Sequence, residues 1–190
     1  MDKITFQNIV RIIVLKPTTE LDIILNQEKY KHLFSFPILY GIILGFSKTI
    51  NKTGVANFID LTATSIGPII LSVLIILISC FVYSWVIYFI SKSLKGEASI
   101  DMTFGLVSYS LIPMVIGGVF YLMLKLFIYS YGQDYSINIF IFYSQIIFVL
   151  WSTIILTIGN ALINGFSMVR SLAATSWYFI LFVLSIIFAK

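Results

Sequence analysis

Residues 66–91, with the sequence IGPIILSVLIILISCFVYSWVIYFIS, contain no charged side chain. Because an α-helix rises about 1.5 Å per residue, a helix of this length exceeds the roughly 30 Å hydrocarbon core of a bilayer. The run therefore predicts a transmembrane helix that is tilted or extends beyond the lipid. Gly67 and Pro68 stand near its start, and the first turn of a helix tolerates proline.

The composition of the whole chain agrees with a membrane environment. Of its 190 residues, 59% are hydrophobic and 11% are charged, whereas an average soluble domain is about 25% charged. Twelve Lys and Arg against eight Asp and Glu give a net charge of +4. Since these cations are scattered rather than clustered, we interpret them as signals of membrane orientation and expect no nucleic-acid partner.

Further apolar runs follow the same pattern. The sequence predicts an all-α integral membrane bundle of five transmembrane helices, at about residues 33–50, 66–91, 103–129, 137–163 and 172–189. Residues 1–32 are predicted to form a separate cytoplasmic or interfacial segment of one or two short helices, ahead of a transmembrane domain at 33–190. Arg11 and Lys16 are candidate contacts with the membrane surface, unless this segment packs on the bundle instead.

The positive charges also predict how the chain crosses the bilayer. With a cytoplasmic N-terminus, eight of the twelve cations lie on the cytoplasmic side, namely Lys3, Arg11, Lys16, Lys29, Lys31, Lys92, Lys95 and Arg170. The other side then holds Lys48, Lys52, Lys125 and Lys190. Because positive charge concentrates on the cytoplasmic side, we expect a multi-pass protein of the cell membrane with its C-terminus on the opposite side.

Neutral polar side chains recur at helical spacing along one face of three predicted spans. They are Ser72, Ser79 and Tyr83 in the second span, Ser110 and Tyr121 in the third, and Gln145, Ser152, Asn160 and Asn164 in the fourth. We interpret them as a candidate intramembrane contact face, because polar groups avoid lipid. Hydrogen bonding between helices and a polar cavity for a lipid headgroup or small solute are both compatible with this pattern.

The third span carries a candidate helix bend at Pro113, Gly117 and Gly118, since proline removes a backbone hydrogen bond. The single cysteine, Cys80, stands in an apolar run and predicts a small buried side chain rather than a disulfide or metal pair.

Residues suited to catalysis or ion coupling are sparse in the predicted spans. No Asp, Glu or His stands near a span centre, which weakens the case for an ion-coupled transporter. His32 is the only histidine, so an HExxH zinc site cannot be built and a serine protease would have only His32 as its base. We expect no enzymatic activity, no cofactor and no metal ion.

Several short motifs occur in a characteristic order: VLKPTTE at 14–20, Gly67-Pro68, GLVSYSLIP at 105–113, VLWSTIILTIGNAL at 149–162 and GFSMVRSLA at 165–173. On these motifs the sequence resembles the Yip family of membrane proteins (Ypt/Rab-interacting protein domain), in the style of its bacterial members. The resemblance implies five spans with a cytoplasmic N-terminus. Eukaryotic relatives are associated with small GTPases and vesicle traffic, but this chain lacks their long acidic or proline-rich N-terminal tail.

These features favour a non-enzymatic membrane protein that organises partners: membrane lipids, a membrane-protein partner or a second copy of the chain. The alternative is a small carrier of an uncharged or lipidic substrate, with the polar faces of the second, third and fourth spans lining one cavity. In that case Asn160→Leu is expected to abolish flux. An enzyme acting on lipid is a third hypothesis.

Overall fold

The computed structural model describes residues 34–53, 58–131 and 135–188. Within these ranges the chain is helical, without strands, and its elements are α3 (Ser35–Thr53), α4 (Phe58–Ser93), α5 (Ile100–Ser110), α6 (Ile112–Tyr131), α7 (Tyr135–Asn164) and α8 (Met168–Phe188). The predicted all-α class is confirmed. The predicted N-terminal helices, with Arg11 and Lys16, lie outside the described residues.

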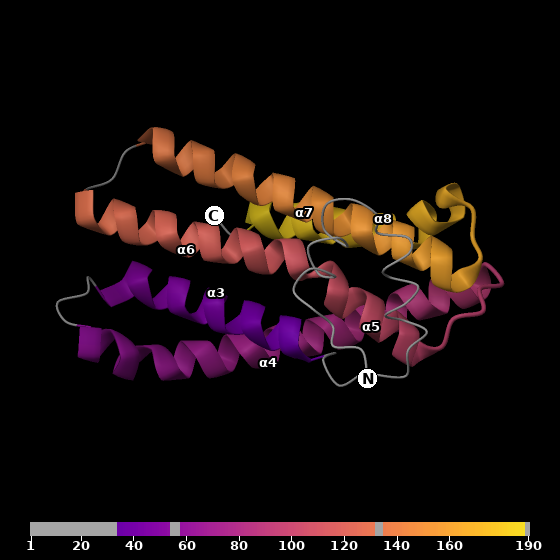
Figure 1. The fold of residues 1–190 in the computed structure, drawn as a ribbon, viewed down its shortest axis with the longest axis horizontal. Coiled ribbons are helices and arrows are strands. Elements are labelled where there is room, and N and C mark those ends of the chain that lie inside the picture. The colour runs from indigo at the N-terminus through magenta and orange to yellow at the C-terminus, as the bar shows by residue number, and fades with distance from the viewer. Residues whose placement is uncertain (1–33, 54–57, 132–134, 189–190) are drawn as a thin grey trace, which may run out of the picture.

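Successive helices run along one common axis and reverse direction, except that α6 continues in the direction of α5 (Figure 1). Helix α3 packs on α4 and on α6, α7 packs on α6 and on α8, and α8 returns to contact α4. The ends where α4 leads to α5 and α7 leads to α8 lie together at one end of the bundle. The start of α4 and the end of α6 lie at the opposite end.

Helix α5 is the most enclosed element of this bundle. It contacts α4, α6 and α7, and most of its residues are buried: Thr103, Gly105, Leu106, Val107, Ser108, Tyr109 and Ser110. A side chain at Gly159 of α7 would collide with Leu106, so glycine allows these two helices to approach closely. The apolar core is centred here and includes Ile87, Leu106, Val107, Ile155 and Leu156.

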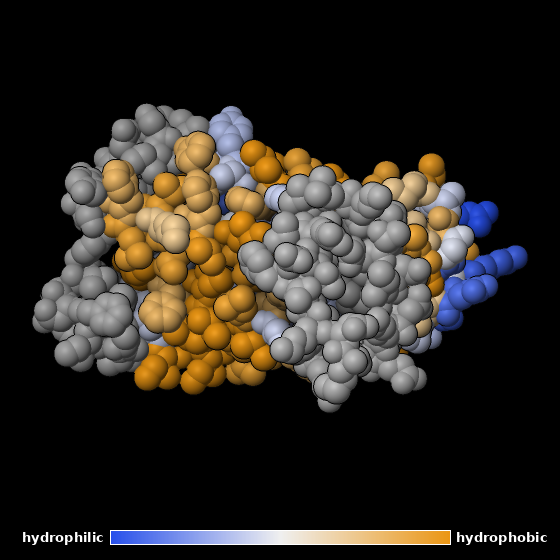
Figure 2. Space-filling model, in the orientation of Figure 1, coloured by the Kyte–Doolittle hydropathy of each residue, from blue (hydrophilic) through white to orange (hydrophobic). Residues whose placement is uncertain are grey.

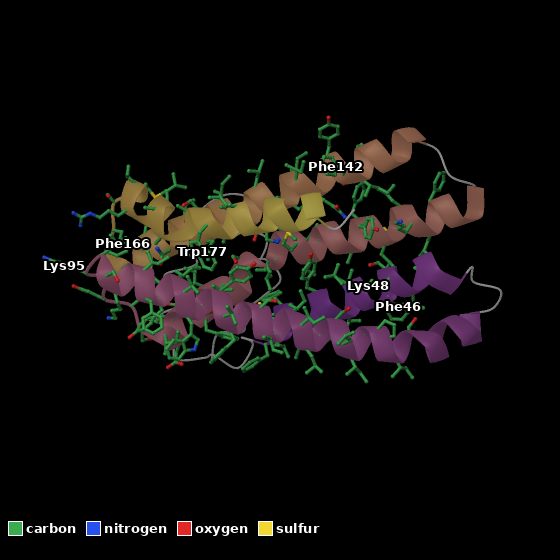
Figure 3. The ribbon with its side chains drawn as sticks, turned by 180° about the vertical axis from the view of Figure 1, so that it is seen from behind. Phe46, Lys48, Lys95, Phe142, Phe166 and Trp177 are labelled. Carbon is green, nitrogen blue, oxygen red and sulfur yellow. The ribbon has the colours of Figure 1, made fainter. Side chains whose placement is uncertain are left out.

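Three helical stretches are long and apolar enough to cross a membrane by length and composition: Ser65–Ser93, Ile100–Phe127 and Phe140–Asn164. Ser35–Ile50 is a shorter apolar helix. Figure 2 shows apolar surface over the middle of the molecule and hydrophilic surface at the end where α4 leads to α5. Exposed Lys95 extends from that end, whereas Lys48 lies away from it (Figure 3). This distribution suits a multi-pass membrane protein.

Helix α4 begins earlier than the sequence indicated. It starts at Phe58, so Pro68 lies inside the helix rather than in its first turn. A proline there removes one backbone donor, which membrane helices tolerate where neighbouring groups compensate. The expected loop at 51–65 is correspondingly shorter, because α3 continues to Thr53. The start of the last helix moves too, from 172 to Met168.

The interruption in the third predicted span lies at Leu111. Helix α5 ends at Ser110, Leu111 adopts a turn, and α6 then continues unbroken through Gly117 and Gly118. Pro113, two residues after the turn, has no backbone N–H with which to continue the helical hydrogen bonds of α5. The two glycines serve close packing instead: a Cβ would approach the Phe148 ring to 2.5 Å at Gly117 and the Ile43 side chain to 2.9 Å at Gly118.

The α3–α4 pair is packed through two glycines of α3. A Cβ at Gly41 would lie 2.6 Å from the Cα of Val73, and one at Gly45 would collide with the Cα of Ile69. The missing side chains let the two backbones touch, which is how small residues four apart promote helix association in lipid.

Helices α4 and α7 end in the same way, at the same end of the bundle. The backbone N–H of Gly96 donates to Ser91 O at 2.8 Å, and that of Phe166 donates to Ala161 O at 2.9 Å. The residue before each donor adopts a left-handed conformation, with φ of 66° at Lys95 and 62° at Gly165. Both are Schellman caps, in which glycine is the usual left-handed residue.

Candidate intramembrane site

Asn160 of α7 is the centre of a buried polar cluster that joins three helices. Its side-chain oxygen accepts from the Ser91 hydroxyl of α4 at 3.2 Å, and its amide donates to the Ser171 hydroxyl of α8 at 3.3 Å. Asn160 is fully buried. Because each bond crosses between helices, Asn160 fixes α4, α7 and α8 relative to one another.

Asn164 extends these contacts to the connection between α4 and α5. Its amide donates to the side-chain oxygen of Asn160 at 2.9 Å, and its own side-chain oxygen accepts from the backbone N–H of Ala98 at 3.1 Å. A side chain at Gly96 would collide with that oxygen. Glycine at position 96 therefore lets the α4–α5 connection lie directly on the end of α7.

Helix α8 contributes two hydroxyls to the same region. Ser171 donates to the backbone oxygen of Thr157 at 2.5 Å, and the hydroxyls of Thr157 and Thr175 lie 2.8 Å apart. All of these side chains are buried. We call the set the Asn160 cluster: Ser91, Thr157, Asn160, Asn164, Ser171 and Thr175.

A separate contact compensates for the interruption at Leu111. The Ser152 hydroxyl of α7 donates to the backbone oxygen of Ser110 at 2.5 Å. Both residues are buried. Because Ser110 is the last residue of α5, its carbonyl group falls where the helical ladder ends, and a neighbouring serine satisfies it.

Two cavities flank α3. The larger, about 350 Å³, lies between α3, α4 and the α5–α6 junction, and we call it the Ser79 cavity; its lining is Tyr40, Leu44, Ile75, Ile76, Ser79, Cys80, Tyr83, Val107, Leu111 and Met114. The smaller, about 100 Å³, lies between α3, α6 and α7, and we call it the Gln145 cavity. It is lined by Tyr40, Leu44, Met114, Gly117, Gly118, Tyr121, Gln145 and Phe148. Tyr40, Leu44 and Met114 line both cavities.

The predicted contact face therefore divides into separate places. Ser79 and Tyr83 line one cavity, and Tyr121 and Gln145 line the other. The rest lie in helix contacts: Ser110 and Ser152 pair with each other, and Asn160 and Asn164 belong to the Asn160 cluster. Ser72 is buried on α4, and its hydroxyl has no hydrogen-bond partner among the described residues. Neither of these two cavities is lined by polar residues from all three spans.

Sequence reasoning missed several residues of these sites. Tyr40 lies on the first predicted span, for which the sequence predicted no polar face, yet it lines both cavities. Ser171 was assigned to a loop because the last helix was expected to start at 172. A helix extended back to Met168 would have placed Ser171 and Thr175 on one face, since residues four apart share a face.

The described residues include no group of three or more His, Cys, Asp or Glu side chains arranged to hold a metal ion. Cys80 is buried and carries a free thiol. The buried polar side chains among the described residues are those of Ser, Thr and Asn.

Comparison with known proteins places this bundle in a family. No curated protein and no solved structure matches the sequence. A family model described as the Yip1 domain does match, over residues 12–189. That range includes every described helix and nearly the whole chain, and the apolar helices fit a multi-pass membrane protein. The chain belongs to the Yip1 domain family.

Proposed function

We propose that this chain is a non-enzymatic membrane protein that organises protein or lipid partners within the bilayer, in a trafficking or membrane-homeostasis type of role. The observation that supports this proposal is the outer face of α4. Large apolar side chains are exposed along it between residues 66 and 89: Ile66, Ile70, Leu71, Leu74, Ile75, Ile78, Phe81, Val82, Trp85 and Phe89. An apolar face of this length is suited to contact with lipid or with another membrane helix.

The interior supports the same proposal. Asn160 and Asn164, the polar side chains most suited to holding a solute, are occupied by contacts between helices. Buried amides that already have their partners rigidify a bundle. This leaves the outer surfaces, rather than a polar channel through the Asn160 cluster, as the places where partners bind.

We further propose a topology of five spans: α3, α4, α5 with α6, α7 and α8. The alternating helix directions support it (Figure 1). Lys92, Lys95 and Arg170 are exposed and belong to the end where α4 leads to α5 and α7 leads to α8. By the positive-inside rule this end faces the cytoplasm, with the N-terminus on the same side and the C-terminus on the other side of the cell membrane.

Cysteine accessibility tests the topology. In a Cys80→Ser background, Lys95→Cys and Lys48→Cys place single thiols at exposed positions nearer opposite ends of the bundle. A membrane-impermeant maleimide added to intact cells is expected to label position 48 and to leave position 95 unlabelled until the cells are opened. Labelling of both positions from one side would overturn the threading.

Photocrosslinking in native membranes tests the function. A photoreactive amino acid in place of Ile78, which is 63% exposed on α4, is expected to give discrete protein or lipid adducts. The matched control is the same substitution at Ile87, which is on the same helix and fully buried. If Ile78, Leu74 and Phe81 all give no adduct above the level of the Ile87 control, the organising role is overturned.

A second candidate function is transport of an uncharged or lipidic substrate. It is favoured by the three residues that line both cavities, Tyr40, Leu44 and Met114. A path between them would pass these residues. Met114→Phe is expected to reduce flux of such a substrate into proteoliposomes, whereas Met123→Phe on the exposed face of α6 is the control that leaves flux unchanged. Equal flux in both variants would count against the carrier.

A further inference from the structure

The Ser79 cavity lies at the middle of the predicted membrane thickness. Ser79 is the midpoint of the membrane-capable stretch Ser65–Ser93, and Met114 is at the midpoint of Ile100–Phe127. Both residues line the cavity. Hydrocarbon rather than water fills a bilayer at this depth, so an occupant has to be soluble in lipid.

The lining fits an apolar molecule that carries a single polar group. Leu44, Ile76, Val107, Leu111 and Met114 supply hydrocarbon, and none of the described residues that line the cavity is charged. Tyr40, Ser79 and Tyr83 supply hydroxyls. A volume of about 350 Å³ falls within the range of ligand sites, which are mostly apolar with a few placed polar groups.

One side of the lining belongs to the exposed surface of α4, and another side belongs to the core. Ile75 lines it and is 47% exposed, next to the exposed side chain Leu74 on the outer face of α4. Cys80 and Val107 form the inner wall and are 3% and 1% exposed. An occupant therefore enters sideways from the bilayer rather than from solution.

The hydroxyl of Ser79 differs from those of Ser84 and Ser93 on the same helix and resembles that of Ser72, which also lacks a hydrogen-bond partner among the described residues. Ser84 donates to Cys80 O at 2.6 Å and Ser93 donates to Phe89 O at 2.9 Å, each one turn back on α4. Ser79 makes no such bond, and neither its hydroxyl nor that of Tyr40 has a hydrogen-bond partner within the described ranges. A hydroxyl without a partner in hydrocarbon is unfavourable, so an occupant with a hydrogen-bonding group would be stabilised here.

We propose that the Ser79 cavity binds an uncharged lipid with a hydroxyl or carbonyl group, and that Ser79 and Tyr40 hydrogen-bond to this group. The inference rests on the proposed lipid-organising function and names the class of lipid. A phospholipid headgroup does not fit, because its phosphate would lie at mid-bilayer beside described lining residues that include neither Lys nor Arg.

The test uses the full chain in phosphatidylcholine nanodiscs with two photoreactive probes. One is a long-chain fatty alcohol with a diazirine near its hydroxyl, and the other is a phosphatidylcholine with a diazirine in its acyl chain. The alcohol is expected to label the segment around Ser79 and Cys80 saturably, with competition by unmodified fatty alcohol. The phosphatidylcholine probe is expected to label the outer face of α4 without saturation.

Two conservative variants assign the polar contact. Ser79→Ala and Tyr40→Phe each remove one hydroxyl and are expected to weaken competition by the alcohol roughly two- to tenfold, as loss of one hydrogen bond predicts. Ser84→Ala is the matched control, because the Ser84 hydroxyl is already bonded within α4. Its competition curve is expected to equal that of the parent protein.

Unsaturable labelling by both probes, or unchanged competition in both the Ser79 and the Tyr40 variants, would overturn the proposal. The organising role fails by a different result, namely the absence of partner adducts at Ile78. Saturable alcohol labelling without such adducts would leave the lipid site standing and overturn only that role.

Discussion

The amide of Asn164 donates to the side-chain oxygen of Asn160 one helical turn earlier on α7, at 2.9 Å. The same oxygen accepts from Ser91 on α4. One buried amide thus receives hydrogen bonds from its own helix and from a neighbour. We therefore expect Asn160 to act mainly on stability, and it lines neither cavity flanking α3.

Asn160→Leu is expected to destabilise the protein and to act on flux only through folding. The substitution leaves the buried Ser91 hydroxyl without its acceptor and removes one of the two acceptors of the Asn164 amide, which keeps the backbone oxygen of residue 160. This predicts a loss of about 1–3 kcal/mol in the free energy of unfolding. Unfolding in detergent titrations measures this change. Gln145→Leu is the control on the same helix, since no hydrogen bond of Gln145 to a described residue is recorded. Equal effects would contradict the cluster's role.

Ser152→Ala is expected to weaken the junction of α5 and α6. The variant leaves the Ser110 carbonyl without the hydroxyl that satisfies it across the helix contact, at a cost of about 1 kcal/mol. The comparison is Ser144→Ala, because Ser144 donates to Ile141 O on its own helix at 2.8 Å. In thermal unfolding, Ser152→Ala should have a lower melting temperature than Ser144→Ala. The reverse order would refute the idea that Ser152 compensates for the break between α5 and α6.

Gly45→Ala is expected to separate α3 from α4. The added methyl group would collide with the Cα of Ile69, so the backbones must move apart. A loss of about 1–3 kcal/mol follows from overpacking of this kind. Gly67→Ala on α4 provides the control, because a Cβ there meets nothing within 4 Å. The control should be neutral or slightly stabilising, as alanine favours helix over glycine.

The left-handed residues that end α4 and α7 predict opposite changes in stability when glycine is introduced at position 95 and when it is removed at position 165. Lys95→Gly removes the strain of a side chain at φ 66° and is expected to raise stability by up to about 1 kcal/mol, after the entropy cost of glycine. Gly165→Ala introduces that strain at φ 62° and is expected to lower stability by about 1 kcal/mol. Melting temperatures shifted in the same direction by both variants would disprove this.

The sequence predicts the positions of the long helices well, because a long apolar run indicates a helix surrounded by lipid. The run at 137–163 corresponds to α7 within two residues at either end. Boundaries near polar residues are less predictable. Phe58 begins α4 ahead of Pro68, because helix continuation past a proline depends on neighbouring helices and not on the local sequence.

The roles of individual polar residues are less accessible to sequence analysis. Helical spacing places Ser79 and Ser72 on one face, but only the neighbouring helices decide that Ser79 lines a cavity while Ser72 is buried. Helical spacing also places Asn160 and Gln145 on one face of α7. Asn160 is nevertheless hydrogen-bonded to two other helices, whereas Gln145 lines a cavity. The spacing of residues predicts the helix face on which a side chain lies, whereas the packing of neighbouring helices decides what that side chain contacts.

The paired Schellman caps of α4 and α7, joined through Asn164 and Ala98, have a mechanical consequence. An end fastened by these contacts is expected to act as a pivot, so that any spreading of the helices is smallest there and grows with distance toward the far end of the bundle. Such spreading would move the lining of the Ser79 cavity beside Ile75 while the contacts around Asn164 stay intact.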